Sequence, residues 1–449
     1  MRVNSVSDVR NQESRLSIRS NVAWTLAGNA CYVVCQYLML MATAKLCDAQ
    51  IVGQYTMAIA ICTPIIVGSQ MQLRQVQATD VRDDYGFGTY MGLRVICTLI
   101  GILLVMGVTV LGGYSETMAP LILLMGCAKG FESLSDAAFG KLQRLERMDL
   151  IAISLASKGI VSSVVFVALL WVTRQLFWPI AGLALVSGAA YVCYDLRIAV
   201  CRGRGCTPPS ITSWLTLGSL FLLAVPLGLT TGLQSLSSNL PRYFLEAFHG
   251  REAVAAFAVA SAPLSLLALF NGAISQATMS RAAYHFQTGN VKAFQRLNWQ
   301  ILAAPVVLGC GFTGIFALWG ATLLELLFTR EYRNAAPLLV MMSAGLAFGS
   351  LTSLGSTILN AARAFRLQLL VIALVVAGQI PLCMYFIPKD AAVGAAYTEC
   401  IRHFLFVIFL SVAGNYVICK NRSGITLPQI GQPLETLRET PRIGQAASH

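Results

Sequence analysis

Residues 91–112 read MGLRVICTLIGILLVMGVTVLG and carry one charged side chain, Arg94, near the start of the run. A helix needs about 20 apolar residues to cross the hydrocarbon core of a bilayer, and this stretch has that length. Comparable apolar runs recur along the chain from residue 22 to residue 415. Because backbone groups in lipid need internal hydrogen-bond partners, these runs predict helices that span a membrane.

The composition agrees with this prediction. Hydrophobic residues make up 56% of the 449 residues and charged residues 12%, whereas soluble domains carry about 25% charged residues. Outer-membrane barrels are excluded because their short, alternating strands give no long apolar runs. We predict an all-α polytopic membrane protein of about 12 transmembrane helices, at approximately 22–44, 51–70, 91–112, 117–140, 150–171, 177–198, 213–237, 252–275, 299–320, 335–360, 367–387 and 391–415.

The distribution of lysine and arginine predicts the orientation. Residues 1–20 are polar and lead directly into the first span, so we expect a cytoplasmic N-terminus without a cleaved signal peptide. With that orientation, 20 of the 32 cations fall in cytoplasmic segments and seven in periplasmic ones. Cytoplasmic loops normally hold this excess, so we predict a bacterial inner membrane protein with both termini in the cytoplasm. Loop placement also accounts for most of the net charge of +12, and we expect no nucleic-acid partner.

The predicted spans divide the chain into two halves. No loop is long enough to fold as a separate domain, and two similar halves are a common plan for transporters. We expect a cytoplasmic N-terminal segment, an N-terminal six-helix bundle, a cytoplasmic linker, a C-terminal six-helix bundle and a flexible cytoplasmic tail, at residues 1–20, 21–199, 200–212, 213–415 and 416–449 respectively.

The fourth predicted span carries three ionisable side chains on one helix face. Glu132 and Asp136 follow Lys129 at the third and seventh positions, a spacing that aligns side chains along a helix. A charged side chain at the centre of a bilayer costs about 2.5–3.5 kcal/mol on insertion scales, so it faces a cavity or a partner. Two interpretations stay open here. The face lines a polar cavity, or Lys129 and Glu132 neutralise each other between helices.

Other polar positions in the spans have similar alternatives. Lys158 in the fifth span has no acid near it in sequence, so it faces a cavity or extends toward the interface. Glu399, Arg402 and His403 in the twelfth span form a self-neutralising structural group or an ion- or proton-responsive one.

Five further positions complete the set of candidate residues. Arg242 follows Pro241 and is an interfacial anchor or part of an outward gate, and Arg74 and Arg94 are solvated or pair at the cytoplasmic mouth. Asn29 and Gln36 share a face of the first span, where they bond a neighbouring helix or sugar hydroxyls.

Motifs for catalysis and nucleotide binding are missing from the sequence. It has no Walker loop, no H-E-x-x-H and no glycine-rich nucleotide fingerprint. Its four histidines, His249, His285, His403 and His449, are too dispersed for a metal site. We therefore expect a transporter with no cofactor and no metal.

Three blocks carry a resemblance to a known family. Residues 70–94 read QMQLRQVQATDVRDDYGFGTYMGLR, residues 129–149 read KGFESLSDAAFGKLQRLERMD and residues 239–246 read NLPRYFLE. In this order, with twelve spans, they resemble the polysaccharide flippases (O-antigen or capsule repeat-unit, Wzx-type) of the multidrug/oligosaccharidyl-lipid/polysaccharide flippase superfamily. The stretch around Leu327–Phe328 and Tyr332–Ala336 is also similar, and the resemblance covers roughly residues 15–415.

The resemblance implies both a fold and an activity. The fold is two six-helix bundles around a central cavity, and the activity is alternating-access transfer of an undecaprenyl-diphosphate-linked oligosaccharide to the periplasmic leaflet. Cavity cations meet the acidic headgroup in such proteins, so Lys129 and Lys158 are expected to form a short ladder for it. The protein is expected to be a monomer. Its expected protein partners are a polysaccharide polymerase and a chain-length regulator. The alternatives are a cation-coupled multidrug exporter of the same superfamily and a membrane glycosyltransferase or polymerase.

Overall fold

The computed structural model describes residues 18–80, 85–201, 213–265, 267, 291–352, 359 and 364–422. The regular structure in these ranges is helical and contains no strand. The helices are α2 (Ile18–Leu46), α3 (Ala49–Ser69), α4 (Leu73–Thr79), α5 (Phe87–Leu111), α6 (Ala119–Arg144), α7 (Met148–Thr173), α8 (Phe177–Ala190), the π-helix η1 (Tyr191–Asp195), α9 (Leu196–Cys201), α10 (Trp214–Ser261), α12 (Val291–Leu327), the 3-10 helix η2 (Arg330–Ala335), α13 (Ala336–Gly349) and α15 (Phe365–Arg422). The all-α prediction is confirmed.

Eight helical segments within the described ranges are long and apolar enough to cross a membrane. One of these, α15, contains the predicted spans 367–387 and 391–415, whereas α10 contains most of 213–237 and only the start of 252–275. Helix α6 is not among the eight although it has 26 residues, and it is the helix that carries Lys129, Glu132 and Asp136. Helix α13 has only 14 residues. The chain is therefore a multi-pass membrane protein, and the number of twelve spans stays a prediction.

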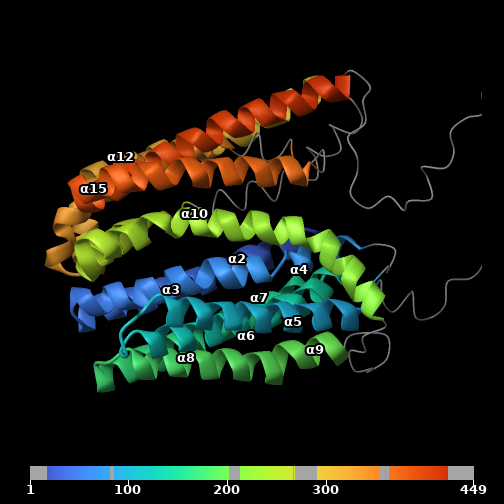
Figure 1. Cartoon of the computed structure of the whole chain (residues 1–449), viewed down its shortest axis with the longest axis horizontal. Helices are drawn as coiled ribbons and strands as arrows, with labels where there is room; N and C mark the ends of the chain where they lie inside the picture. Colours follow the sequence, from blue (N-terminus) through green and yellow to red (C-terminus); the bar gives the residue numbers. More distant parts are fainter. Residues whose placement is uncertain are drawn as a thin grey trace, which may run out of the picture.

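Helices α2 to α9 form one group, which occupies the lower part of Figure 1. Within it, α2 packs against α7, α5 against α6, and α8 against both α6 and α7. Small residues permit these contacts, as at Gly28, where an added Cβ would lie 2.6 Å from the Cα of Ala152. Such close backbone approach drives helix association in lipid, where burial of apolar surface contributes little.

The helices α12, α13 and α15 form a second group, at the top of Figure 1. Helix α15 is a hairpin of two helical segments, because the backbone leaves helical geometry at Ala391, with φ 46° and ψ −123°. Helix α13 packs against both α12 and α15. The arrangement of two facing six-helix bundles stays a prediction.

Helix α10 lies between the two groups and packs against α3 on one side and α15 on the other (Figure 1). Its backbone approaches α3 closely at two glycines, since a Cβ added to Gly232 would lie 3.1 Å from the Cα of Gly68. Pro226 and Pro241 lie inside the helix, and Gly250, with φ 78° and ψ −175°, separates its last segment from the rest. A left-handed φ of this size is readily adopted only by glycine.

The two ends of the molecule differ in how the groups meet. At the end where α2 finishes, called the Lys45 end, Lys45 Nζ donates to the carbonyl oxygen of Leu326 in α12 at 3.0 Å. The rings of Tyr37 and Phe328 also meet there edge to face, with centroids 5.7 Å apart. At the opposite end, called the Arg74 end, α10 packs through Leu220 and Ala224 against α5. So α10 belongs to the α2–α9 group at the Arg74 end.

Candidate functional site

Helix α6 carries the main polar strip of the α2–α9 group. Lys129, Glu132, Asp136, Gly140 and Gln143 succeed one another every three or four residues, so they share one face. Around this face lie α3, α4, α5, α7 and α8, all of which contact α6. The strip runs from the middle of the helix to the Arg74 end and holds two ionic clusters. A third cluster lies beside α6, between α7 and η1.

The first cluster is the pair Lys129 and Glu132, whose Nζ and Oε2 lie 2.8 Å apart. Both side chains keep about one fifth of their surface exposed (20% and 19%). Glu132 is within electrostatic range of Tyr32 in α2, whose hydroxyl accepts from Gln36 Nε2 at 3.0 Å. The two residues thus neutralise each other, as one interpretation held. They also remain partly accessible, as a residue that lines a polar cavity would be.

Asn29 and Gln36 bond within their own helix. Asn29 Nδ2 donates to the carbonyl oxygen of Thr25 at 2.7 Å, and its side chain is exposed. Gln36 bonds Tyr32, also in α2. Among the residues that the structure describes, neither amide bonds a neighbouring helix.

The second cluster places one carboxylate between two guanidinium groups. Asp136 Oδ2 lies 3.0 Å from Arg94 Nη2, and Asp136 Oδ1 lies 3.2 Å from Arg74 Nη1. Arg94 is completely buried (0% exposed), whereas 27% of the Arg74 side chain is exposed. Gln143 orients Arg74 by accepting from its Nε at 2.9 Å. Arg74 and Arg94, expected at one mouth of the protein, do pair there with the same acid.

The Asp136 cluster, defined as Asp136, Arg74, Arg94 and Gln143, carries more positive than negative charge. Two N–H groups of Arg94, on Nε and Nη1, are buried and have no hydrogen-bond partner among the residues that the structure describes. Leaving a buried donor of a charged group unsatisfied costs about 1–3 kcal/mol or more. With two guanidinium groups against one carboxylate, the cluster has a net positive charge within the described part of the chain.

The third cluster pairs Lys158 in α7 with Asp195, the last residue of the π-helix η1. Lys158 Nζ lies 2.9 Å from Asp195 Oδ2 and donates to Ser135 Oγ at 2.7 Å. Ser154 Oγ donates to the other carboxylate oxygen of Asp195 at 2.5 Å. The side chains of the pair are 3% and 0% exposed. This enclosure does not fit a cation that faces a cavity, since the lysine is fully bonded to protein groups.

Asp195 was missed as a partner because it lies 37 residues from Lys158 in the sequence. The signal that would have found it is charge balance. The run 150–171 holds one charged residue, Lys158, whereas the run 177–198 holds Asp195 and, at its end, Arg197. Lys158 has no acid in its own span, and an acid in a neighbouring span neutralises it at less cost than leaving it unpaired.

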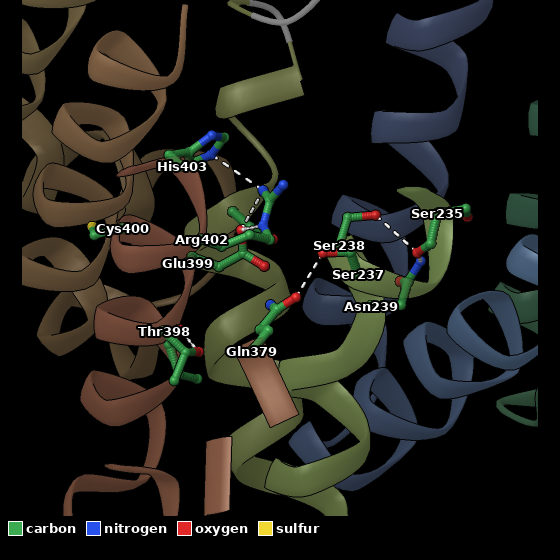
Figure 2. Close-up of polar contacts among 12 residues, drawn as sticks. Ser235, Ser237, Ser238, Asn239, Gln379, Thr398, Glu399, Cys400, Arg402 and His403 are labelled. Atoms are coloured by element: carbon green, nitrogen blue, oxygen red, sulfur yellow. Dashed lines mark hydrogen bonds and ion pairs between the residues drawn. The ribbon is translucent and has the colours of Figure 1, made fainter. Parts of the chain in front are cut away.

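The C-terminal half holds a fourth cluster, shown in Figure 2. Arg402 donates from Nε to Glu399 Oε2 at 2.8 Å, and its Nη2 lies 3.2 Å from His403 Nε2. Gln379, from the first segment of α15, accepts from Ser237 of α10 at 2.6 Å and so joins the two helices. Figure 2 shows the Gln379 amide between Ser237 and the Glu399 carboxylate. The expected self-neutralising pair of Glu399 and Arg402 is present.

Arg242 lies inside the C-terminal half. Its Nη1 donates to Asn239 Oδ1 at 2.5 Å, and its guanidinium lies 5.8 Å from the centroid of the Phe257 ring. Glu399 is within electrostatic range of it. The described contacts that join the two groups at the Lys45 end are Lys45 with Leu326 and Tyr37 with Phe328, and Arg242 takes part in neither.

In the four clusters together with Arg242, cations outnumber acids by six to four: Arg74, Arg94, Lys129, Lys158, Arg242 and Arg402 against Glu132, Asp136, Asp195 and Glu399. The described residues contain no group of three or more His, Cys, Asp or Glu able to hold a metal ion. The arrangement is suited to attract an anion.

The comparisons with known proteins agree with a transporter fold. No family model matches the chain. The capsular polysaccharide biosynthesis protein CapF of Staphylococcus aureus is 24% identical over 393 residues, which cover 86% of this chain and 97% of CapF.

Solved structures show the same fold at low sequence identity. The lipid II flippase MurJ in its inward closed conformation has a TM-score of 0.68 and 14% identity, covering 90% of this chain and 91% of MurJ. A mutant of the Vibrio cholerae MATE transporter VcmN has a TM-score of 0.65 and 14% identity, with coverage of 90% and 96%. A MOP superfamily transporter from Pyrococcus furiosus has a TM-score of 0.63 and 12% identity, with coverage of 88% and 95%. The chain therefore has the fold of the MOP superfamily transporters, and its resemblance to the polysaccharide flippases of that superfamily is confirmed.

Proposed function

We propose that the chain is a flippase that moves a lipid-linked oligosaccharide repeat unit, carried on undecaprenyl diphosphate, across the bacterial inner membrane. The observation that supports this best is the excess of cations in the polar clusters. A diphosphate is strongly disfavoured in a low-dielectric interior unless positive charge compensates it. The similarity to CapF, which is named for capsular polysaccharide biosynthesis, supports a polysaccharide precursor as the cargo.

In this proposal, the clusters have different tasks. Lys129 and Glu132 keep accessible surface, and with Asn29 and Gln36 they offer hydrogen-bonding groups to the cargo. The Asp136 cluster supplies net positive charge near the cytoplasmic mouth, which is the predicted location of the Arg74 end. Lys158 and Asp195 hold α7 against η1 and take no part in binding. Glu399, Arg402, His403 and Arg242 are the charged groups that respond to an ion or a proton in the C-terminal half.

The second candidate function is a cation-coupled drug exporter, which the similarity to VcmN favours. A transporter of cationic compounds needs acids to compensate its cargo. In the four clusters each of Glu132, Asp136, Asp195 and Glu399 is already paired with a cation. This pairing leaves no unneutralised acid there for a cationic drug, so the flippase is the preferred function.

The test uses the full chain reconstituted in proteoliposomes that contain a fluorescent undecaprenyl-diphosphate-linked oligosaccharide. A membrane-impermeant reagent destroys the fluorophore in the outer leaflet, and transport is the rate at which protected label becomes accessible. We expect faster exposure than in protein-free vesicles. The same vesicles are assayed for efflux of a cationic dye. Dye efflux without lipid transfer would replace the flippase by the exporter.

A further inference from the structure

The Asp136 cluster differs from the other ion pairs because its acid contacts two cations, so one cation can leave for another partner. Lys129, Lys158 and Arg402 each contact an acid that, within the described ranges, touches no second cation. If one of these cations left to bind an anion, its acid would stay behind unpaired. Breaking a buried pair in this way costs about 3–5 kcal/mol. Lys158 and Arg402 are therefore held by their acids, and Lys129 can meet an anion only while it stays paired with Glu132.

Arg74 is placed differently, because Asp136 has a second cation in Arg94. Arg94 approaches Asp136 Oδ2 at 3.0 Å, and Arg74 uses the other oxygen at 3.2 Å. When Arg74 moves away, Asp136 remains neutralised by a fully buried guanidinium. Arg74 can thus exchange Asp136 for an anion without leaving a buried charge unpaired.

Arg74 is also reachable and oriented. Its side chain is 27% exposed, whereas Arg94 is completely enclosed. Gln143 holds its Nε, and its guanidinium carbon lies 5.7 Å from the centroid of the Phe139 ring. A planar guanidinium that is held on one edge can donate two parallel hydrogen bonds from its other N–H groups. Two oxygens of one phosphate have the spacing to accept them.

The unpartnered groups of Arg94 supply the second observation. Its Nε and Nη1 are buried without hydrogen-bond partners in the described part of the chain, and the residue has 0% exposure. The cluster holds two cations against one acid, so it attracts an anion even though Arg94 itself cannot reach one. Arg94 is then a positioning residue, which acts through Asp136.

We propose that Arg74 is the docking residue for a diphosphate at the Arg74 end, and that Arg94 frees it for this task by holding Asp136. The choice of diphosphate as ligand rests on the proposed function, and the geometry itself requires only a phosphate-type anion. Docking replaces one carboxylate oxygen on Arg74 by phosphate oxygens, and no covalent bond changes. Arg242 lacks an acid in contact within the described residues, but its buried Nε and its bonds to Asn239 and Ser261 keep it inside the C-terminal half.

The experiment measures binding of inorganic pyrophosphate to the purified full chain in nanodiscs of neutral phosphatidylcholine. Arg74→Gln should weaken binding about tenfold, since it removes a charge-assisted fork to phosphate. Lys141→Gln is the matched control, because Lys141 is a half-buried cation at the same end of α6 that lies over the Phe87 ring. We expect less than about a twofold change for the control, because Lys141 lies over Phe87 and is not one of the residues paired with Asp136. Equal loss in both variants would overturn the proposal, because it would show only a general effect of charge.

A double-mutant cycle tests the exchange of partners. Arg94→Gln should weaken binding severalfold although Arg94 is inaccessible, because Asp136 then retains Arg74. Adding Asp136→Asn to Arg94→Gln should restore binding to within about twofold of the wild type, since non-additivity is the sign of a shared partner. A double variant as weak as Arg94→Gln alone contradicts the role of Arg94. Size-exclusion profiles and melting temperatures identify misfolded variants, and Arg74→Lys tests the site with the charge retained.

Further nanodiscs separate the sources of the anion. Discs with an isoprenyl diphosphate should compete with pyrophosphate, whereas phosphatidylglycerol should compete weakly because it carries one phosphate. Competition by phosphatidylglycerol alone overturns the diphosphate assignment. If pyrophosphate binds but lipid-linked oligosaccharide is not transferred, the proposed function fails and the docking site stands. If Arg74→Gln keeps both lipid transfer and pyrophosphate affinity, Arg74 is not the docking residue, but the proposed flippase function still stands.

Discussion

Lys158 and Asp195 lie 37 residues apart in the chain and 2.9 Å apart in the folded protein. Their pair is almost completely enclosed, and serines 135 and 154 complete its hydrogen bonds. A pair of this kind is destabilising to break, although it contributes little compared with an apolar pair of the same volume. The pair therefore tests whether Lys158 has a structural or a binding role.

We predict that Lys158→Gln lowers the free energy of unfolding by about 3–5 kcal/mol, because it leaves the Asp195 carboxylate unpaired. The double variant Lys158→Met/Asp195→Leu should recover most of this loss and should retain transport. The measurement is thermal unfolding in detergent together with transfer of the labelled lipid in proteoliposomes. Loss of transport in a stable double variant would return Lys158 to the cargo path.

Lys129 is expected to behave differently because it keeps exposed surface. Lys129→Gln should reduce the initial rate of lipid transfer severalfold, since the cargo headgroup loses a cation that is partly accessible. Exchange of the pair, Lys129→Glu with Glu132→Lys, keeps the charge balance and moves the cation by one turn, so it should not restore the rate. Rates are normalised to the amount of protein in the membrane. Full activity in the exchanged variant would mean that the two residues only neutralise each other.

The close approach of α3 and α10 gives a prediction about packing. A Cβ added to Gly53 would lie 2.2 Å from the carbonyl oxygen of Arg251, which is backbone and cannot turn aside. Gly53→Ala should therefore destabilise the protein by about 1–3 kcal/mol, the usual cost of overpacking. Gly107→Ala in α5 is the control, because an added Cβ there meets nothing within 4 Å. Equal melting temperatures for the two variants would show that this contact is looser than described.

The predicted orientation is tested by labelling single cysteines in a variant without native cysteines. Arg144→Cys, at the end of α6, should react only after the cytoplasm is opened. Glu116→Cys, between α5 and α6, should react with an impermeant reagent in intact cells. The physical reason is the excess of lysine and arginine in the loops at the Arg74 end. Labelling of residue 144 from outside would invert the topology and place the Asp136 cluster on the periplasmic side.

The spacing of apolar and charged residues along the sequence predicted the helices and the ion pairs between residues three positions apart. The run 91–112 became α5, at Phe87–Leu111, because its length and composition suit a bilayer. The pair of Lys129 and Glu132 was also predictable, since residues three apart on a helix meet. The same reasoning gave Glu399 with Arg402.

Contacts between distant segments were beyond such reasoning. Asp136 meets Arg94 and Arg74 from 42 and 62 residues away, and no rule of spacing selects those partners. The role of Gln379 depends on α10 crossing α15, which the sequence alone does not place. Counting unmatched charges per span would have suggested some pairs, but the division of Asp136 between two arginines requires three helices to be positioned together.

Helix α10 packs with α3 and α5 of one group and with α15 of the other, so it joins two parts of the molecule. A rigid helix placed in this way would oppose separation of these parts. Pro226 and Pro241 each interrupt the backbone hydrogen-bond ladder of α10, and proline is where helices bend. Relative motion of the two parts would therefore be accommodated as curvature of the helix between these prolines.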